Sequence, residues 1–164
     1  METNKQPAEA RMDNAGVARI LTLLADLLEI QGENSFKIAA YRRAAAAIEQ
    51  LGEDIAVVWR EGRLASIPGV GAALEKKLDE MLRTGDLALL RRVQAQIPPG
   101  VVQLLQIPGV GPRTAKKLWD AGILSPADAE AAARAGRLRE LPGLGARTEA
   151  RILAGVEALL QNRE

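Results

Sequence analysis

Apolar residues along this chain recur with the period of an α-helix. Between residues 14 and 30 they fall at spacings of three and four and form one stripe: Val17, Ile20, Leu21, Leu24, Leu27 and Leu28. Asp13 or Asn14 precedes this stripe and suits the cap of a helix. No segment alternates apolar and polar residues in the way that a half-buried strand does. The pattern therefore predicts an all-α fold.

Breaks rich in glycine, proline, serine and asparagine separate further helical segments, with Ser35 expected to cap the second helix. Residues 1–12 are polar and expected to be loose, and Pro98-Pro99-Gly100 is the clearest break in the chain. This break predicts a helical domain over 13–97 and a second domain over 98–164. The predicted helices cover about 13–30, 35–51, 54–61, 72–83, 86–96 and 126–135, with helical pairs around 101–121 and from 137 to 161.

One pentapeptide occurs three times, as Ile-Pro-Gly-Val-Gly at 67–71 and 107–111 and as Leu-Pro-Gly-Leu-Gly at 141–145. We call these segments turn 1, turn 2 and turn 3. Pro-Gly suits the centre of a type II turn, because proline presets φ and glycine accepts the positive φ that follows. The second glycine leaves the backbone uncovered where the next helix begins, so unpaired N–H groups point outward at a positive helix end. Three such anion sites indicate a polymer of anions, and DNA is the leading candidate.

The helices that follow the three turns carry matching charge. Aligned on the second glycine, a cation falls at the same place in every copy, at Lys77, Lys117 and Arg151. This combination is typical of helix-hairpin-helix units, and its alternative is a repeated structural corner with solvated lysines. The pattern predicts that DNA is contacted by the turn glycines and the cations after them: Gly69, Gly71, Lys76, Gly109, Gly111, Arg113, Lys116, Lys117, Gly143, Gly145, Arg147 and Arg151.

Composition excludes several classes of function. The chain has no histidine and no cysteine, which excludes histidine-based triads, thiolate metal sites and cysteine nucleophiles. It has one phenylalanine, one tyrosine and two tryptophans, too few for a base-stacking platform. The net charge is +1, so DNA binding is expected to be local. The sequence has no apolar run long enough for a membrane span and no signal pattern, which favours the cytoplasm.

The segment 32–45, Gly-Glu-Asn-Ser-Phe-Lys-Ile-Ala-Ala-Tyr-Arg-Arg-Ala-Ala, together with turn 1 and Thr84-Gly85, resembles the N-terminal part of the family X DNA polymerases. Residues 14–161 resemble the bacterial branch of that family. The resemblance implies a lyase-like helical domain with one hairpin, followed by a second helix-hairpin-helix domain. The polymerase palm that follows in the family has no counterpart in this sequence, so no polymerase activity is expected from it. The chain is either a stand-alone relative or a piece of a longer polymerase.

The same resemblance implies a chemical role for Lys77, which aligns with a lysine that forms a Schiff base with the sugar aldehyde of an abasic site. Lys37 and Tyr41 align with residues that bind a 5′-phosphate, and they lie four apart on one helix face. Lys76, Lys37 and Arg42 crowd around this lysine and would hold the 5′-phosphate in place. Alternatively, Lys77 only contacts phosphate. The chain departs from the family at three positions, Ala73, Asp86 and Leu89, where the family has cations.

The resemblance further implies Na⁺ or K⁺ bound by backbone carbonyls, those of Ala65, Ile67 and Val70 and those of Leu105, Ile107 and Val110. Three functions stay open. The first is a sequence-nonspecific DNA-binding protein of repair type, which grips the backbone at nicks or gaps. The second is a deoxyribose-phosphate or abasic-site lyase, and the third is a module that serves a protein partner. We expect a bacterial, monomeric protein whose partners are nicked, gapped or abasic duplex and repair proteins.

Overall fold

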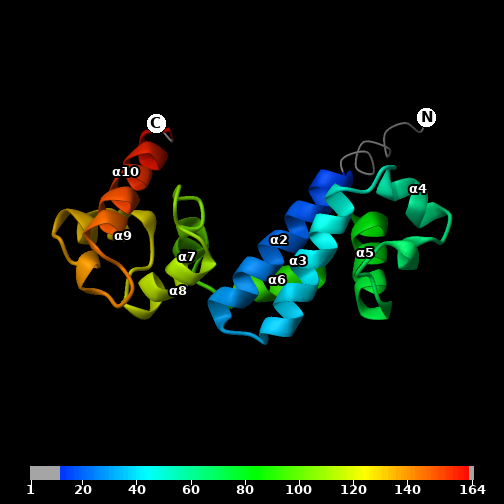
Figure 1. Cartoon of the computed structure of the whole chain (residues 1–164), viewed down its shortest axis with the longest axis horizontal. Helices are drawn as coiled ribbons and strands as arrows, with labels where there is room; N and C mark the ends of the chain where they lie inside the picture. The colour runs from blue at the N-terminus through cyan, green and yellow to red at the C-terminus, as the bar shows by residue number, and fades with distance from the viewer. Residues whose placement is uncertain (1–11, 163–164) are drawn as a thin grey trace. The chain divides into compact units, whose positions relative to one another are not determined.

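The computed structural model describes residues 12–162 and confirms the all-α fold, since this part of the chain contains no strand. The loose N-terminus predicted for 1–12 lies outside the described residues, apart from Met12. Figure 1 labels the α-helices, which are α2 (Asn14–Gln31), α3 (Ser35–Glu49), α4 (Ile55–Arg60), α5 (Ala72–Thr84), α6 (Ala88–Ala95), α7 (Pro99–Leu104), α8 (Pro112–Asp120), α9 (Pro126–Arg134) and α10 (Ala146–Asn162). Two short 3-10 helices, η1 (Leu64–Ser66) and η2 (Leu138–Glu140), precede turns 1 and 3.

Two helix starts differ from the sequence-based prediction. Asn34, not Ser35, caps α3, because its side-chain oxygen accepts the N–H groups of Phe36 at 2.7 Å and Lys37 at 3.3 Å. The run 98–100, predicted as a break, begins a helix: Pro98 is the cap and Pro99 the first residue of α7. Proline is tolerated there because a first-turn N–H has no partner within the helix.

Backbone contacts divide the chain into two compact units, which are described separately. The first unit contains the described residues 12–28 and 33–93, and the second contains 29–32 and 94–162. The domain boundary expected at Pro98 stays a prediction.

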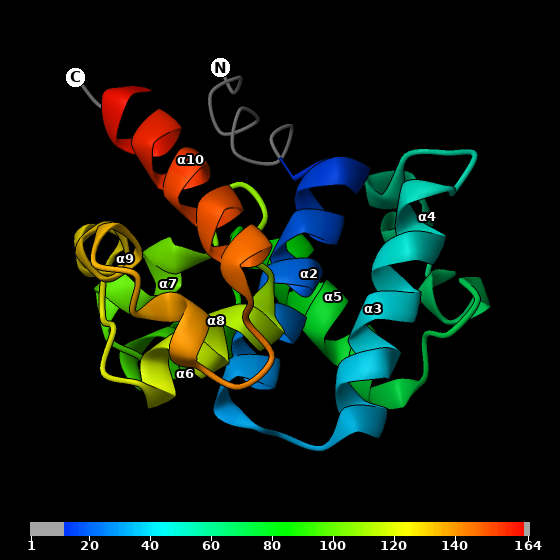
Figure 2. The same cartoon turned by 60° about the vertical axis from the view of Figure 1, so that its left-hand side comes forward.

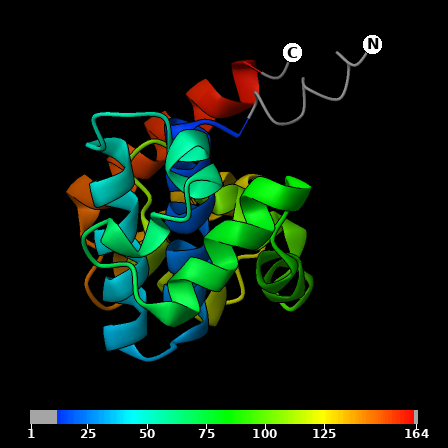
Figure 3. The same cartoon turned by 90° about the vertical axis from the view of Figure 1, so that its right-hand side faces the viewer.

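In the first unit, α2 and α3 run antiparallel (Figure 3). Asn14, at the start of α2, donates to the carbonyl of Glu53 at 2.9 Å and accepts the N–H of Ile55 at 2.8 Å. Further along the pair, Arg42 and Asp26 form an ion pair of 2.8 Å. The core between the helices contains the fully buried side chains Leu21, Leu24, Leu27, Ile48, Ile55, Leu78 and Met81. Turn 1 lies beside α3, since a Cβ atom added to Gly69 would be 4.0 Å from the amide nitrogen of Ala44.

In the second unit, α9 lies against α10 (Figure 2). Two glycines in this unit allow other backbone segments to pack closely against them. A Cβ atom added to Gly100 would collide with the carbonyl of Leu124, and one added to Gly155 would lie 2.6 Å from the carbonyl oxygen of Pro108. Gly155 therefore seats turn 2 directly on α10. None of the helices within 12–162 has both the length and the apolar character that a membrane crossing requires.

Candidate nucleic-acid interface

The three turns have the backbone that their sequence predicts. The first glycine of each has a positive φ: +86° at Gly69, +92° at Gly109 and +83° at Gly143. In each turn, the residue after this glycine donates its N–H to the carbonyl three positions earlier, at 3.0 Å in turn 1, 2.9 Å in turn 2 and 3.1 Å in turn 3. Pro-Gly thus closes a hydrogen-bonded turn in every copy.

The second glycine of each turn stands at the start of a helix, before α5, α8 and α10. Gly71 and Gly111 are the helix caps, with φ of −95° and −98°, and neither has a side chain to occupy the first N–H groups. A Cβ atom added at Gly71, Gly111 or Gly145 would meet nothing within 4 Å. The backbone at these points is therefore open to an approaching ligand, and its free N–H groups favour an anion.

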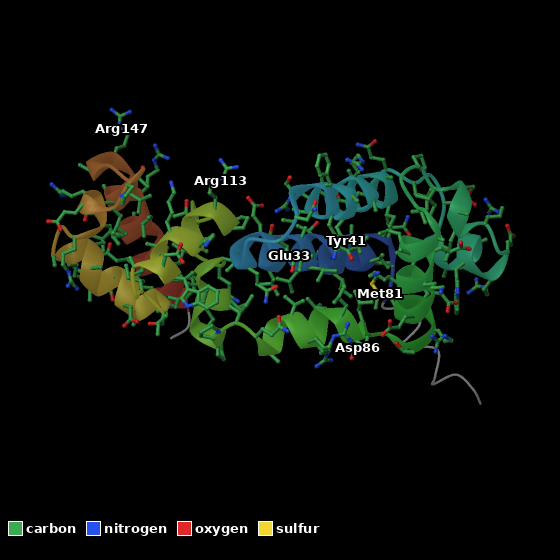
Figure 4. All side chains as sticks on the ribbon, turned by 90° about the horizontal axis from the view of Figure 1, so that it is seen from below. Glu33, Tyr41, Met81, Asp86, Arg113 and Arg147 are labelled. Atoms are coloured by element: carbon green, nitrogen blue, oxygen red, sulfur yellow. The ribbon has the colours of Figure 1, made fainter. Side chains whose placement is uncertain are left out.

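Two exposed arginines accompany the turns of the second unit. Arg113 follows turn 2 and Arg147 follows turn 3, at equivalent positions in the first helical turn. Figure 4 shows that both side chains project from this unit in the same direction. Turns 2 and 3 and their arginines can therefore contact one extended anionic ligand together.

A cleft of about 700 Å³ lies in the first unit between α3, α5 and the start of α6, and we call it the cationic cleft. It brings together the residues predicted for phosphate and sugar chemistry, since Lys37, Tyr41, Lys76 and Lys77 all line it. Tyr41 is 4% exposed, and burial raises the pKa of its hydroxyl (Figure 4). The tyrosine stays neutral in this position and can donate a hydrogen bond to an anion in the cleft.

Comparison with known proteins agrees with this geometry. Residues 12–87 match the helix-hairpin-helix domain family, and residues 101–158 match the SAM-like helix-hairpin-helix tandem family. The chain is a tandem of helix-hairpin-helix domains.

The chain is also 29% identical, over 143 residues, to the DNA polymerase/3'-5' exonuclease PolX of Bacillus subtilis (strain 168). The aligned region covers 87% of this chain and 25% of that protein, so the chain spans about a quarter of the relative's length. The resemblance to the family X DNA polymerases is confirmed.

The helix-hairpin-helix units differ in what lies around their turns. Lys117 of α8 reaches turn 3, where a Cβ atom added to Gly143 would collide with its ammonium group. Its neighbour Lys116 forms an exposed ion pair of 3.2 Å with Asp120. Arg151, at the repeat position of Lys117, is exposed on α10. Lys117 and Arg151 thus occupy the same position of the repeat but have different surroundings.

Glu149 is a structural residue of turn 3 that the sequence-based prediction missed. It is 3% exposed, and its Oε2 accepts the N–H groups of Leu138 at 3.0 Å and Arg139 at 3.2 Å. Its Oε1 pairs with the Arg139 guanidinium at 2.7 Å. Burial alone would raise the pKa of Glu149, but these hydrogen bonds and the Arg139 charge outweigh it and hold the pKa below the ordinary value.

The remaining predicted contacts are placed as follows. Arg42 pairs with Asp26 and is not one of the residues that line the cationic cleft. Arg92 does line the cleft, although the prediction did not include it. Phe36, which begins the exposed side of α3 beside Lys37, is 83% exposed and presents an aromatic face to solvent.

The backbone carbonyls suggested for a monovalent cation lie in and just before turns 1 and 2. Those of Ile67 and Ile107 each accept one turn hydrogen bond, from Val70 and Val110. A carbonyl oxygen has two lone pairs, so each of these two oxygens can accept one further partner. A neutral oxygen of this kind suits a hard cation such as Na⁺ or K⁺. Residues 12–162 contain no acidic cluster that could hold a metal ion.

Proposed function

We propose that this chain binds DNA through its backbone, without reading base sequence, and grips the phosphates on either side of a nick or short gap. The observation that carries the proposal is the open space at Gly71 and Gly111, where a phosphate can approach bare N–H groups at a helix start. Backbone N–H groups bind phosphate oxygens and carry no base readout, so affinity should be similar for all sequences.

The comparisons support the proposal in its general form. The helix-hairpin-helix families and the likeness to a protein named a DNA polymerase both favour DNA as the partner. A preference for nicks or gaps, repair proteins as partners, a monomeric state and a cytoplasmic location in a bacterial cell are further parts of the proposal. Na⁺ or K⁺ at turns 1 and 2 is another, and the helix starts and the cation would then hold the same phosphate.

A substitution at Gly111 tests the proposal. Threonine is accepted at a helix cap about as well as glycine. Its hydroxyl oxygen would accept the N–H groups that an anion needs, and its methyl group would cover them. We expect Gly111→Thr to weaken binding of a labelled gapped duplex at least about tenfold, equivalent to about 1.4 kcal/mol, in fluorescence anisotropy.

Gly52→Thr is the matched control, because Gly52 also has nothing within 4 Å of an added Cβ but lies outside the three turns. Equal affinity of Gly111→Thr and the wild type, on two unrelated sequences, would contradict the proposal. Absence of binding to any DNA at low salt would favour a module that serves a protein partner.

A second candidate function, a deoxyribose-phosphate lyase, is favoured by one observation: Lys77 lies in the same cleft as Lys37 and Tyr41. In this reaction the neutral Lys77 amine would attack the C1′ aldehyde of the sugar, and water would leave to form the Schiff base. Loss of a C2′ proton would then expel the 3′-phosphate by β-elimination, and water would release the lysine.

Borohydride reduction of the Schiff base tests this candidate. A covalent DNA adduct is expected with the wild type and with Lys76→Ala, whose lysine lines the same cleft. The adduct should disappear in Lys77→Ala. An adduct that persists in Lys77→Ala would exclude Lys77 as the nucleophile, and no adduct with the wild type would exclude the activity.

A further inference from the structure

A groove of about 530 Å³ lies in the first unit between α4 and α5, and we call it the Trp59 groove. One wall contains Trp59 of α4 and Leu64 of η1, and the other contains Glu75, Asp79, Glu80 and Arg83 of α5. None of the three turns contributes to this lining. The groove therefore offers a surface for a ligand other than the one that the turns bind.

The indole of Trp59 is held in the groove by its polar edge. It is half-buried, and its Nε1–H donates to Asp79 Oδ1 at 2.8 Å. This bond, followed by the one from Arg83, holds the pKa of Asp79 below its ordinary value, although desolvation opposes the shift. Because the one N–H of the indole is engaged, Trp59 can meet a ligand through the face of its ring, which attracts cations.

The three carboxylates of the groove differ in how far the protein satisfies them. Asp79 also pairs with Arg83 at 3.4 Å, and Glu80 Oε2 accepts the N–H of Ala88 at 2.7 Å. Glu75 lies one helical turn before Asp79 and is half-buried. Within the part of the chain that the structure describes, its carboxylate has no hydrogen bond or ion pair. Glu75 therefore has a negative charge to share with a ligand.

The charges of the groove favour a cationic ligand over a nucleic acid. Two cations line it, but Arg83 is paired with Asp79 and Lys76 is shared with the cationic cleft. A phosphate would be repelled by the carboxylates, and a neutral base would leave Glu75 unpaired. An arginine side chain suits both features, because its planar guanidinium stacks on an aromatic face and donates paired hydrogen bonds to a carboxylate.

We propose that the Trp59 groove is a docking site for an arginine side chain of a protein partner, stacked on Trp59 and paired with Glu75. The inference goes beyond DNA binding and does not depend on it. It assigns to the first unit a second surface, on which the partner is recognised by charge complementarity with Glu75 and by the indole.

Tryptophan fluorescence tests the inference in the absence of DNA. Trp119→Phe leaves Trp59 as the only tryptophan, so its emission reports on the groove. Titration with the peptide acetyl-Ala-Arg-Ala-amide should give a saturable change. The same peptide with citrulline, which has nearly the shape of arginine but no charge, should bind at least about fivefold more weakly.

Substitution of Glu75 separates docking from nonspecific quenching. Glu75→Gln, made in the Trp119→Phe background, should weaken binding of the arginine peptide at least about fivefold. Glu49→Gln is the matched control, because it removes an exposed carboxylate of α3 outside the groove, and affinity should stay within about twofold. Trp59→Phe, which keeps Trp119, should show no saturable change.

Four results would overturn the inference. They are equal binding of the arginine and citrulline peptides, unchanged affinity in Glu75→Gln, an equal loss in Glu49→Gln, and the same response from both single-tryptophan proteins. Tighter binding of deoxyadenosine than of the arginine peptide would assign the groove to a base and overturn it as well. Circular dichroism confirms that each variant is folded, and Glu75→Gln tests the site with the bond between Trp59 and Asp79 intact.

Discussion

Turns 2 and 3 have nearly the same sequence and the same backbone, yet their surroundings differ. Turn 2 is open on its outer side, since a Cβ atom at Gly109 or Gly111 would meet nothing within 4 Å. Turn 3 has Lys117 against Gly143 and the buried Glu149 behind it. On its inner side, the Pro108 carbonyl of turn 2 is in close contact with Gly155 of α10.

The comparison shows that a repeated motif does not guarantee a repeated role. The turn itself requires only proline, a glycine at positive φ and one hydrogen bond, which all copies share. Access to its N–H groups depends on side chains that come from elsewhere in the chain. Turn 2 therefore offers a bare backbone site, while turn 3 offers a site with a lysine already beside it.

The largest expected effect comes from filling the contact beneath turn 2. In Gly155→Ala the new methyl group would lie 2.6 Å from the Pro108 carbonyl oxygen and 3.0 Å from Ile107 Cγ2. Overpacking of this kind costs about 1–3 kcal/mol, even though alanine favours a helix. Urea unfolding measures the loss, with Ala150→Ser at an exposed position of α10 as the control. Unchanged stability would show that turn 2 can shift freely.

The next effect concerns the positive φ that both turns require. Alanine in the left-handed region costs about 1–2 kcal/mol, so Gly109→Ala and Gly143→Ala should both destabilise the chain by that amount. Gly111→Ala and Gly145→Ala serve as controls, because these glycines lack a positive φ and have open space around them. If Lys117 packs firmly on turn 3, Gly143→Ala costs more than Gly109→Ala, and adding Lys117→Ala removes the excess.

A smaller effect is expected from the carboxylate that distinguishes turn 3. Glu149→Gln removes the charge that pairs with Arg139, so the thermal midpoint at pH 7 should fall by a few degrees. The folded-state pKa of Glu149 is lowered below 4.5, so its contribution is present above that pH and is lost as the pH falls below it. The difference between variant and wild type should therefore shrink in acid. A difference that grows in acid would contradict this assignment.

The smallest effects should come from the exposed arginines beside the two turns. If each contacts one phosphate, Arg113→Gln and Arg147→Gln should each reduce the slope of log affinity against log salt by about 0.9. The loss of affinity should be a few-fold and alike for all sequences. A change in Arg113→Gln alone would mean that only turn 2 reaches the DNA.

Much of the fold could be predicted from local pattern. The period of apolar residues located α2, and the Pro-Gly repeats located all three turns with the correct backbone at Gly69, Gly109 and Gly143. The cleft residues Lys37, Tyr41 and Lys77 came from a family resemblance, and the structure places them together.

What could not be predicted depends on contacts between distant segments. The burial of Glu149 requires η2 to fold back against α10, and Glu75 and Ala115 occupy its position in the other copies. The same is true of Lys117 against Gly143 and of Arg92 in the cleft, since no local period tells an arginine that faces a cavity from one that faces solvent. Asn34 was passed over as a cap because Ser35 offers an equally good side chain.

The contact between turn 2 and Gly155 has a consequence for local unfolding of the second unit. Turn 2 lies on the helix that follows turn 3, and turn 3 is touched by Lys117 from the helix that follows turn 2. Each turn is thus contacted by the helix that follows the other turn. The amide hydrogens of Val110 and Leu144, which close the two turns, should therefore exchange with deuterium as a single cooperative group.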